Sequence, residues 1–230
     1  MKTAGILGGM SWESTTTYYQ LINRGIAREL GGLHSARLLL HSVDFAPIEK
    51  LQHEDRWEEC GEILADAARS LERGGADFLV LATNTMHRVA EAIEAATSLD
   101  LLHIADATGE ALVEAGHTTV ALLGTRFTME QDFYRGRLEA RFGLRVLTPD
   151  QPGCATVHRI ICDELCRGRI LEGSRDAYTR IIEELAQDGA GAVILGCTEI
   201  GLLVKPEYAP IPVFDTTEVH AAATVARMLA

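Results

Sequence analysis

The chain has 230 residues, of which 47% are hydrophobic and 23% charged, and its formal net charge is −12 at pH 7. This length allows one substantial core or two smaller ones, and the negative charge disfavours nucleic acids and anionic membranes as partners. No stretch approaches the roughly 18 apolar residues that span a bilayer, and the glycine-broken N-terminal run is too short for a signal peptide. We therefore expect a soluble protein of the cytoplasm that acts on a small molecule.

Short apolar segments alternate with long amphipathic segments through the first half of the chain. The apolar segments predict buried parallel strands, and the amphipathic segments predict helices. The predicted strands are residues 4–7, 38–41, 78–81 and 101–104, and the main predicted helices are residues 12–30 and 54–72. Strands that alternate with helices are typical of a parallel sheet covered on both faces.

The second half of the chain repeats this pattern. Residues 75–84 align without gaps with residues 189–198, Gly8 matches Gly124, and residues 104–108 resemble residues 213–217. The second set of predicted strands is residues 120–123, 144–147, 192–195 and 213–214, with helices at residues 129–142 and 174–187. A repeat this long indicates two copies of a domain, because solenoid repeats span roughly 20–50 residues.

The predicted fold class is therefore α/β, with two pseudo-symmetric flavodoxin-like domains that each contain a four-stranded parallel sheet. The predicted N-terminal domain comprises residues 1–105 and 216–230, and the C-terminal domain comprises residues 106–215. We expect the active site in the cleft between them, because open parallel sheets bind ligands beyond the carboxyl ends of their strands.

Small polar residues follow the predicted strands in both halves. Thr83 begins such a loop in the first half and aligns with Cys197, which begins the matching loop 114 positions later. Any one hydroxyl residue here has helix capping as its default role, and Thr128 with Gln131 and Asp215 with Glu218 have capping-box spacing. Their concentration in both halves favours a shared carboxylate-binding site.

The sequence gives little support for a cofactor, a metal or a disulfide framework. The first glycine turn lacks the spacing of a dinucleotide-binding motif, and no Walker lysine follows it. Pyridoxal phosphate requires a Schiff-base lysine, and the chain has only Lys2, Lys50 and Lys205. Lys2 precedes the first predicted strand, and we expect the other two in surface segments. The odd number of cysteines fits a reducing compartment, and Cys162 with Cys166 lacks the second pair of a zinc site.

Four segments resemble the aspartate/glutamate racemase superfamily, in order and across essentially the whole chain. They are GILGGMSWEST at 5–15, TNTMH at 83–87, GTRFTM at 124–129 and GCTEI at 196–200. Within the superfamily, the chain is most similar to the enterobacterial L-aspartate/glutamate-specific, broad-specificity amino-acid racemase group, which also has threonine at the first catalytic position. The resemblance implies a cofactor-independent enzyme, usually a homodimer, that binds an amino acid between its two domains.

The implied catalytic residues are Thr83 and Cys197. Racemisation removes the α-hydrogen from one face of the carbon and returns a proton to the other, so an acid and a base must flank that carbon. Most superfamily members use two cysteines, because a thiol can supply both protonation states when its surroundings lower its pKa. We expect the dipole of the following helix to stabilise the Cys197 thiolate. Thr83 is a poor base that can position water or relay a proton.

The resemblance also implies substrate-binding residues. Side chains and backbone groups of the polar loops would hold the α-carboxylate and ammonium, Gln52 would meet the distal carboxylate, and Met10 with Trp12 would close the pocket or simply pack. The complete implied binding set is Met10, Gln52, Asn84, Thr85, Thr125, Thr128 and Thr198. His87 and Glu199 would tune the catalytic positions or serve structure alone. Cys166 stands where many aspartate racemases have a lysine, which weakens any strict preference for aspartate.

Three functions remain open from the sequence. The first is an active racemase of aspartate, glutamate or both. The second is a weakly active or non-catalytic homologue that binds an acidic amino acid. The third is a related cysteine-dependent decarboxylase or isomerase.

Overall fold

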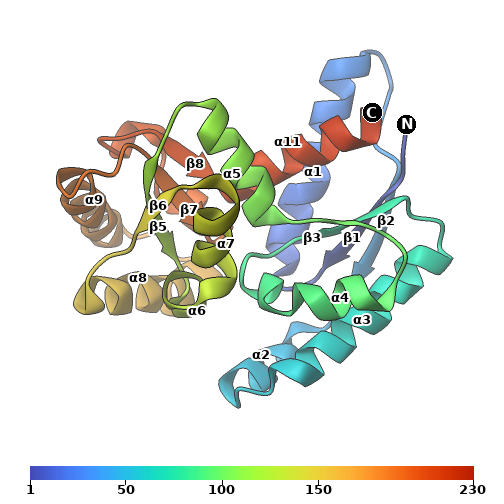
Figure 1. Cartoon of the computed structure of the whole chain (residues 1–230), viewed down its shortest axis with the longest axis horizontal. Helices are drawn as coiled ribbons and strands as arrows, with labels where there is room; N and C mark the ends of the chain where they lie inside the picture. Colours follow the sequence, from blue (N-terminus) through green and yellow to red (C-terminus); the bar gives the residue numbers. More distant parts are fainter. The chain divides into compact units, whose positions relative to one another are not determined.

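The computed structural model describes residues 1–230, and the chain forms two compact units. Unit one comprises Met1–Ile104 and His220–Ala230, and unit two comprises Ala105–Val219. Each unit contains a four-stranded parallel sheet, with strand orders β2-β1-β3-β4 and β6-β5-β7-β8 (Figure 1). The two orders are equivalent, which confirms the duplicated α/β fold predicted from the sequence.

Unit one follows the predicted alternation of strands and helices. Its elements are β1 (Ala4–Gly8), α1 (Trp12–Leu30), β2 (Leu38–Ser42), α2 (Phe45–His53), α3 (Trp57–Arg73), β3 (Phe78–Leu81), η1 (Thr85–Val89), α4 (Ala90–Ala96) and β4 (Leu101–Leu102). The central strands β1 and β3 are buried along their whole length. Tyr18, Ile22 and Ile26 of α1 pack against them because they recur on one face of that helix.

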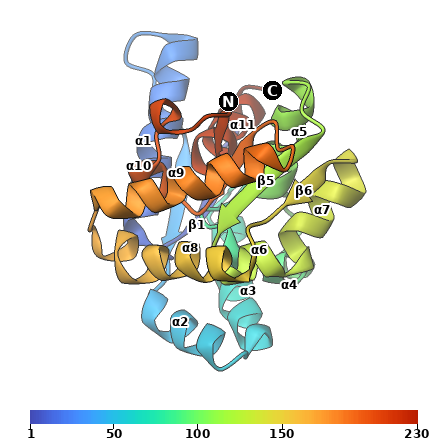
Figure 2. The same ribbon diagram turned by 90° about the vertical axis from the view of Figure 1, so that its left-hand side faces the viewer.

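Unit two has the same plan with shorter helices after its first strand. Its elements are β5 (Thr119–Gly124), α6 (Arg126–Glu130), α7 (Asp132–Phe142), β6 (Arg145–Leu147), α8 (Gln151–Asp163), η2 (Leu165–Arg167), α9 (Glu172–Gln187), β7 (Val193–Gly196), α10 (Ile200–Leu203), η3 (Pro206–Tyr208) and β8 (Val213–Asp215). Helices α8 and α9 run beside each other (Figure 2), and their apolar faces share one core with β5 and β7.

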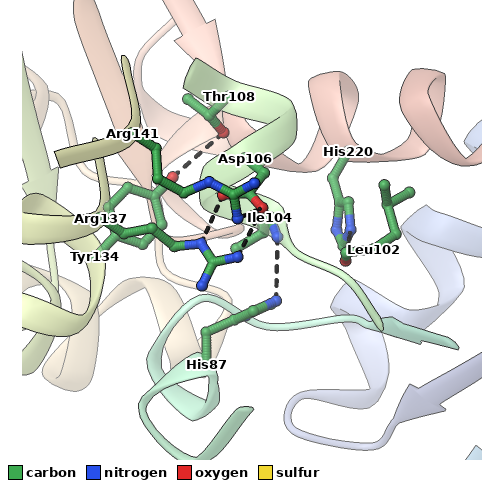
Figure 3. A network of polar contacts seen from close by, with 9 residues as sticks. All are labelled: His87, Leu102, Ile104, Asp106, Thr108, Tyr134, Arg137, Arg141 and His220. Atoms are coloured by element: carbon green, nitrogen blue, oxygen red, sulfur yellow. Dashed lines mark hydrogen bonds and ion pairs between the residues drawn. The ribbon is translucent and has the colours of Figure 1, made fainter. Parts of the chain in front are cut away.

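Helices α5 (Ile104–Glu114) and α11 (Thr216–Leu229) contain the two positions where the chain passes from one unit to the other. Within unit two, α5 is fixed to α7 by charged hydrogen bonds. Arg137 donates to both carboxylate oxygens of Asp106 at 2.6 and 2.7 Å, and Arg141 donates at 2.8 Å (Figure 3). This bidentate contact orients the start of α5.

None of the helices combines the length and apolar character that crossing a bilayer requires.

Several predicted boundaries were wrong for local reasons. The predicted strand 101–104 ends at Leu102 because Ile104 already begins α5. The predicted helix 54–72 begins only at Trp57, after Asp55, whose φ of 57° ends the preceding segment in the left-handed region. The predicted helix 129–142 is divided into α6 and α7 because Gln131 is extended.

The two predicted capping residues had different outcomes. Thr128 does not cap a helix; instead Thr125 caps α6 and accepts a hydrogen bond from the Thr128 backbone N–H. The prediction for Asp215 is confirmed, since its carboxylate accepts from the backbone N–H of Thr217 at 2.8 Å at the start of α11.

Candidate functional site

Thr83 begins the loop that follows β3 in unit one. It is half-buried, and its backbone N–H donates to the Leu81 carbonyl at 2.9 Å, which turns the chain sharply out of the strand. Asn84 is buried, and Thr85 is half-buried at the start of η1. The Thr83 carbonyl accepts a hydrogen bond from Nδ1 of the buried His87 at 2.8 Å. His87 therefore contacts the backbone of Thr83.

Gln52 and Met10 lie in the same unit as this loop. Gln52, in the last turn of α2, places its Nε2 2.8 Å from the sulfur of Met86, which follows Thr85 in η1. Met10 follows β1, whose neighbour in the sheet is β3, so the loops of Met10 and Thr83 leave the same edge. Met10 is buried, whereas Trp12 is 67% exposed. Trp12 therefore does not pack in the core of this unit.

Cys197 begins the matching loop of unit two, directly after β7. Its Sγ donates to Oε2 of Glu199 at 3.0 Å, and the same oxygen accepts from the Thr198 hydroxyl at 2.7 Å. The Cys197 residue is only 8% exposed. Three side chains from one short loop thus form a single hydrogen-bonded group around one carboxylate.

Burial raises the pKa of the Cys197 thiol well above its usual range, and the Glu199 carboxylate raises it further. A hydrogen bond from the backbone N–H of Glu199 lowers the pKa of the thiol, but this effect is smaller than those of burial and of the carboxylate. Any stabilisation of the thiolate at the start of α10 is therefore outweighed, and the pKa of the thiol is raised instead of lowered. Helix α10 has only four residues, and a carboxylate stands beside the sulfur. The resting group is a thiol with a proton acceptor in contact.

Thr125 and Thr128 lie at the neighbouring strand end. Gly124 and Gly196 are register partners on β5 and β7, so the loops of Thr125 and Cys197 leave the sheet side by side. A Cβ on Gly124 would lie 2.8 Å from the Gly196 carbonyl oxygen, so the close approach of these strand ends requires glycine. Thr128 is fully buried against both glycines, and its hydroxyl lies 3.1 Å from that of Thr125.

The predicted site residues therefore form two groups, each within its own unit. The loops of Met10, Gln52, Thr83, Asn84 and Thr85 belong to unit one, and those of Thr125, Thr128, Cys197 and Thr198 belong to unit two. None of the five cysteines is in a disulfide, and no three His, Cys, Asp or Glu side chains are arranged to hold a metal. Cys162 and Cys166 are exposed.

Two buried histidines of unit one were missed by sequence reasoning. His103 lies against His87, with ring centroids 4.3 Å apart. His220 donates from Nε2 to the Leu102 carbonyl at 2.8 Å, and Figure 3 shows these two residues. The Tyr18 hydroxyl donates to the other ring nitrogen of His220 at 2.8 Å. Burial lowers the pKa of His220 to about 4. In the sequence, each of these histidines is marked only by its position next to apolar residues, and this position does not identify the groups that the histidine contacts.

The fold, with one four-stranded parallel sheet in each unit, is that of the two-domain Asp/Glu racemases, which are isomerases. The Asp/Glu/hydantoin racemase family model matches residues 7–224, so the chain belongs to this family. A curated relative, the broad specificity amino-acid racemase RacX of Bacillus subtilis strain 168, is 26% identical over 98% of both chains.

Solved structures agree with this assignment. A Yersinia pestis protein, provisionally described as an Asp/Glu racemase, is 52% identical with a TM-score of 0.95 over the whole of both chains. An aspartate racemase homologue from Pyrococcus horikoshii OT3 is 34% identical, with a TM-score of 0.85 over the same extent. The family resemblance inferred from the sequence is thereby confirmed.

Proposed function

We propose that this protein racemises an acidic amino acid, aspartate or glutamate, without a cofactor. Thr83 and Cys197 would serve opposite faces of the α-carbon. The observation that carries the proposal is the contact between the Cys197 thiol and the Glu199 carboxylate, 3.0 Å apart in a buried loop. A thiol with a proton acceptor in contact can pass between its two protonation states, which racemisation requires.

On the Cys197 face, the Glu199 carboxylate accepts the thiol proton, and the resulting thiolate removes the α-proton of the substrate. In the reverse direction, the thiol gives its proton to the substrate carbanion and recovers one from the carboxylic acid of Glu199. The substrate ammonium would favour the thiolate by its positive charge, offsetting the burial that favours the thiol at rest.

On the Thr83 face, the hydroxyl is too weak an acid to form an alkoxide at neutral pH. We propose that it positions a water molecule, which exchanges the proton with the substrate. The half-buried setting of Thr83 is compatible with such a water. Enantiomers have equal free energy in water, so both directions share one value of kcat/KM at equilibrium whichever group serves each face. Thr83 therefore limits the common rate and cannot make the reaction one-way.

Substrate binding would use neutral donors. We propose that Asn84, Thr85, Thr125 and Thr198 bind the α-carboxylate and ammonium, with Gln52 at the distal carboxylate. Met10 would form part of the pocket lining. Thr128 would act through Thr125, because its own side chain is fully buried and contacts that hydroxyl. Three lysines, all exposed, offer no buried amine for pyridoxal phosphate, which supports a reaction without that cofactor.

We also propose that the protein is a cytoplasmic homodimer. The large apolar side chains of Trp12, Tyr19 and Leu40 are each more than half exposed in the single chain, which supports a protein partner for unit one. Five cysteines without a disulfide support a reducing compartment. Light scattering after size-exclusion chromatography tests the dimer directly.

The decisive test is exchange of the substrate α-hydrogen in deuterated buffer, followed by NMR and chiral chromatography across a panel of amino acids. We expect deuterium incorporation into aspartate or glutamate together with the opposite enantiomer. A folded protein that binds an acidic amino acid without exchange supports the binding-homologue alternative. Release of carbon dioxide from a malonate substrate without racemisation supports the decarboxylase alternative.

A further inference from the structure

We propose that His87 is a positioning residue that holds the Thr83 loop in place for proton transfer. This inference rests on the proposed function, because it assigns a purpose to the backbone geometry of Thr83. His87 lies four residues after Thr83, and its Nδ1 is 2.8 Å from the Thr83 carbonyl oxygen. A carbonyl oxygen can only accept, so Nδ1 carries the proton.

The second nitrogen of the same ring has the opposite role. The backbone N–H of Ile104 donates to Nε2 of His87 at 3.2 Å (Figure 3). The two hydrogen bonds together assign a single protonation form, a neutral ring with its proton on Nδ1. Either the other tautomer or the imidazolium ion would lose at least one of these bonds.

The packing of His87 explains why this form is held. The residue is 2% exposed, and its ring lies against His103. The segment that follows β4 is held on both sides of His103, since His220 bonds the Leu102 carbonyl and His87 bonds the Ile104 N–H. Because β3 and β4 are paired, His87 joins the loops that follow two neighbouring strands.

This connection bears on the rate of the proposed reaction. A reacting group displaced by about 1 Å can cost roughly a hundredfold in rate. The Thr83 carbonyl is the backbone group nearest the proposed proton-transfer hydroxyl, so fixing it limits where the hydroxyl can lie. A buried histidine that serves only core packing would not require its Nδ1–H to point at that carbonyl.

Two substitutions separate the two hydrogen bonds. His87→Asn places an amide N–H near the former Nδ1 and can still donate to the Thr83 carbonyl, but it loses the acceptor for Ile104. His87→Gln reaches the former Nε2 position and can still accept from Ile104, but it loses the donor to Thr83. Both remove the imidazole packing, so a purely structural role would affect both alike.

The readouts are kcat and KM for α-hydrogen exchange, together with thermal stability. We expect His87→Gln to lower kcat roughly tenfold to a hundredfold with little change in KM, and His87→Asn to retain most of the wild-type kcat. Cys60→Ala is the control, because it removes another buried side chain of unit one whose thiol bonds the Ile48 carbonyl and neither the Thr83 loop nor the segment around His103. It should lower stability and leave kcat near the wild-type value.

The outcomes distinguish this inference from the proposed function. A folded wild-type protein without exchange overturns both. An active wild type in which His87→Asn and His87→Gln lose kcat equally overturns only the positioning role. If neither variant folds, long-range proton–nitrogen NMR of the wild type decides instead. A neutral His87 with its proton on Nδ1 supports the inference, and a proton on Nε2 overturns it.

Discussion

The Thr83 loop and the Cys197 loop follow equivalent strands of two similar sheets, but their polar groups are of different kinds. Beside Thr83 the buried polar side chains are those of Asn84 and His87, and His87 binds the backbone carbonyl of Thr83. Around Cys197 the buried polar group is the carboxylate of Glu199, which binds the side chain directly. The two copies of the fold have therefore diverged, with a carboxylate bound to the side chain in one loop and a histidine bound to the backbone in the other.

Removal of the Cys197 thiol should have the largest effect on activity of any change to the two loops. We expect Cys197→Ala to lower exchange and racemisation by roughly 10²–10⁴-fold, the usual contribution of an acid–base group. Cys154→Ala is the matched control, since Cys154 is also a buried cysteine of unit two and its thiol donates to the Pro149 carbonyl. Equal activity in the two variants, measured by chiral chromatography, would contradict the assigned role.

Because His220 is buried in unit one, we expect the free energy of unfolding to decrease in acid. The pKa of His220 falls from 6.5 to about 4 on folding, so the unfolded chain binds the extra proton between these values. The free energy of unfolding should therefore be highest above pH 6.5 and fall by about 3 kcal/mol as the pH decreases to about 4.

Urea unfolding of the wild type and of His220→Gln at several pH values measures this contribution by difference. The variant should lack that part of the acid slope. His34→Gln, which changes an exposed histidine, should retain it. Parallel pH curves for the wild type and His220→Gln would show that the buried ring does not govern acid stability.

Glu199→Gln should change two properties of the Cys197 loop, which are the pKa of the thiol and the rate of the reaction. Without the negative charge, the pKa of the Cys197 thiol should fall, because a like charge no longer opposes ionisation. The rate should nevertheless decrease roughly tenfold to a hundredfold, because the proton acceptor has been lost. The pH profile of kcat/KM reports both changes. A profile identical to that of the wild type would leave Glu199 without a role in proton transfer.

The mildest change makes the two loops alike. Thr83→Cys supplies a thiol at the second proton-transfer position, and we expect racemisation to rise by about tenfold. Thr97→Cys is a suitable control, because it places a thiol at another half-buried threonine of unit one, at the end of α4 and outside the proposed site. Normal folding and binding of Thr83→Cys without any gain in rate would indicate that residue 83 does not face the α-carbon.

The repeated sheets could be predicted because buried parallel strands are continuous apolar segments and the two halves share their turns. The strand ends that carry Thr83 and Cys197 followed from that pattern. The left-handed backbone of Asp55, which separates α2 from α3, has no comparably strong sequence signal. The pairing of His87 with Ile104 joins residues 17 positions apart and depends on the tertiary fold. The raised pKa of Cys197 depends on side-chain direction and burial, which the GCTEI segment alone does not specify.

The burial of Cys197 has a practical consequence for inhibitor work. Alkylating reagents react with thiolates, and this thiol is both enclosed and held in its protonated form. Cys162 and Cys166 are exposed on the same unit and would be modified first. The amount of label on the whole protein would then report adducts at these two exposed cysteines, while Cys197 remained unmodified. A compound that mimics the substrate ammonium should alkylate Cys197 more readily than a small neutral reagent, because it would bring its own positive charge to the sulfur.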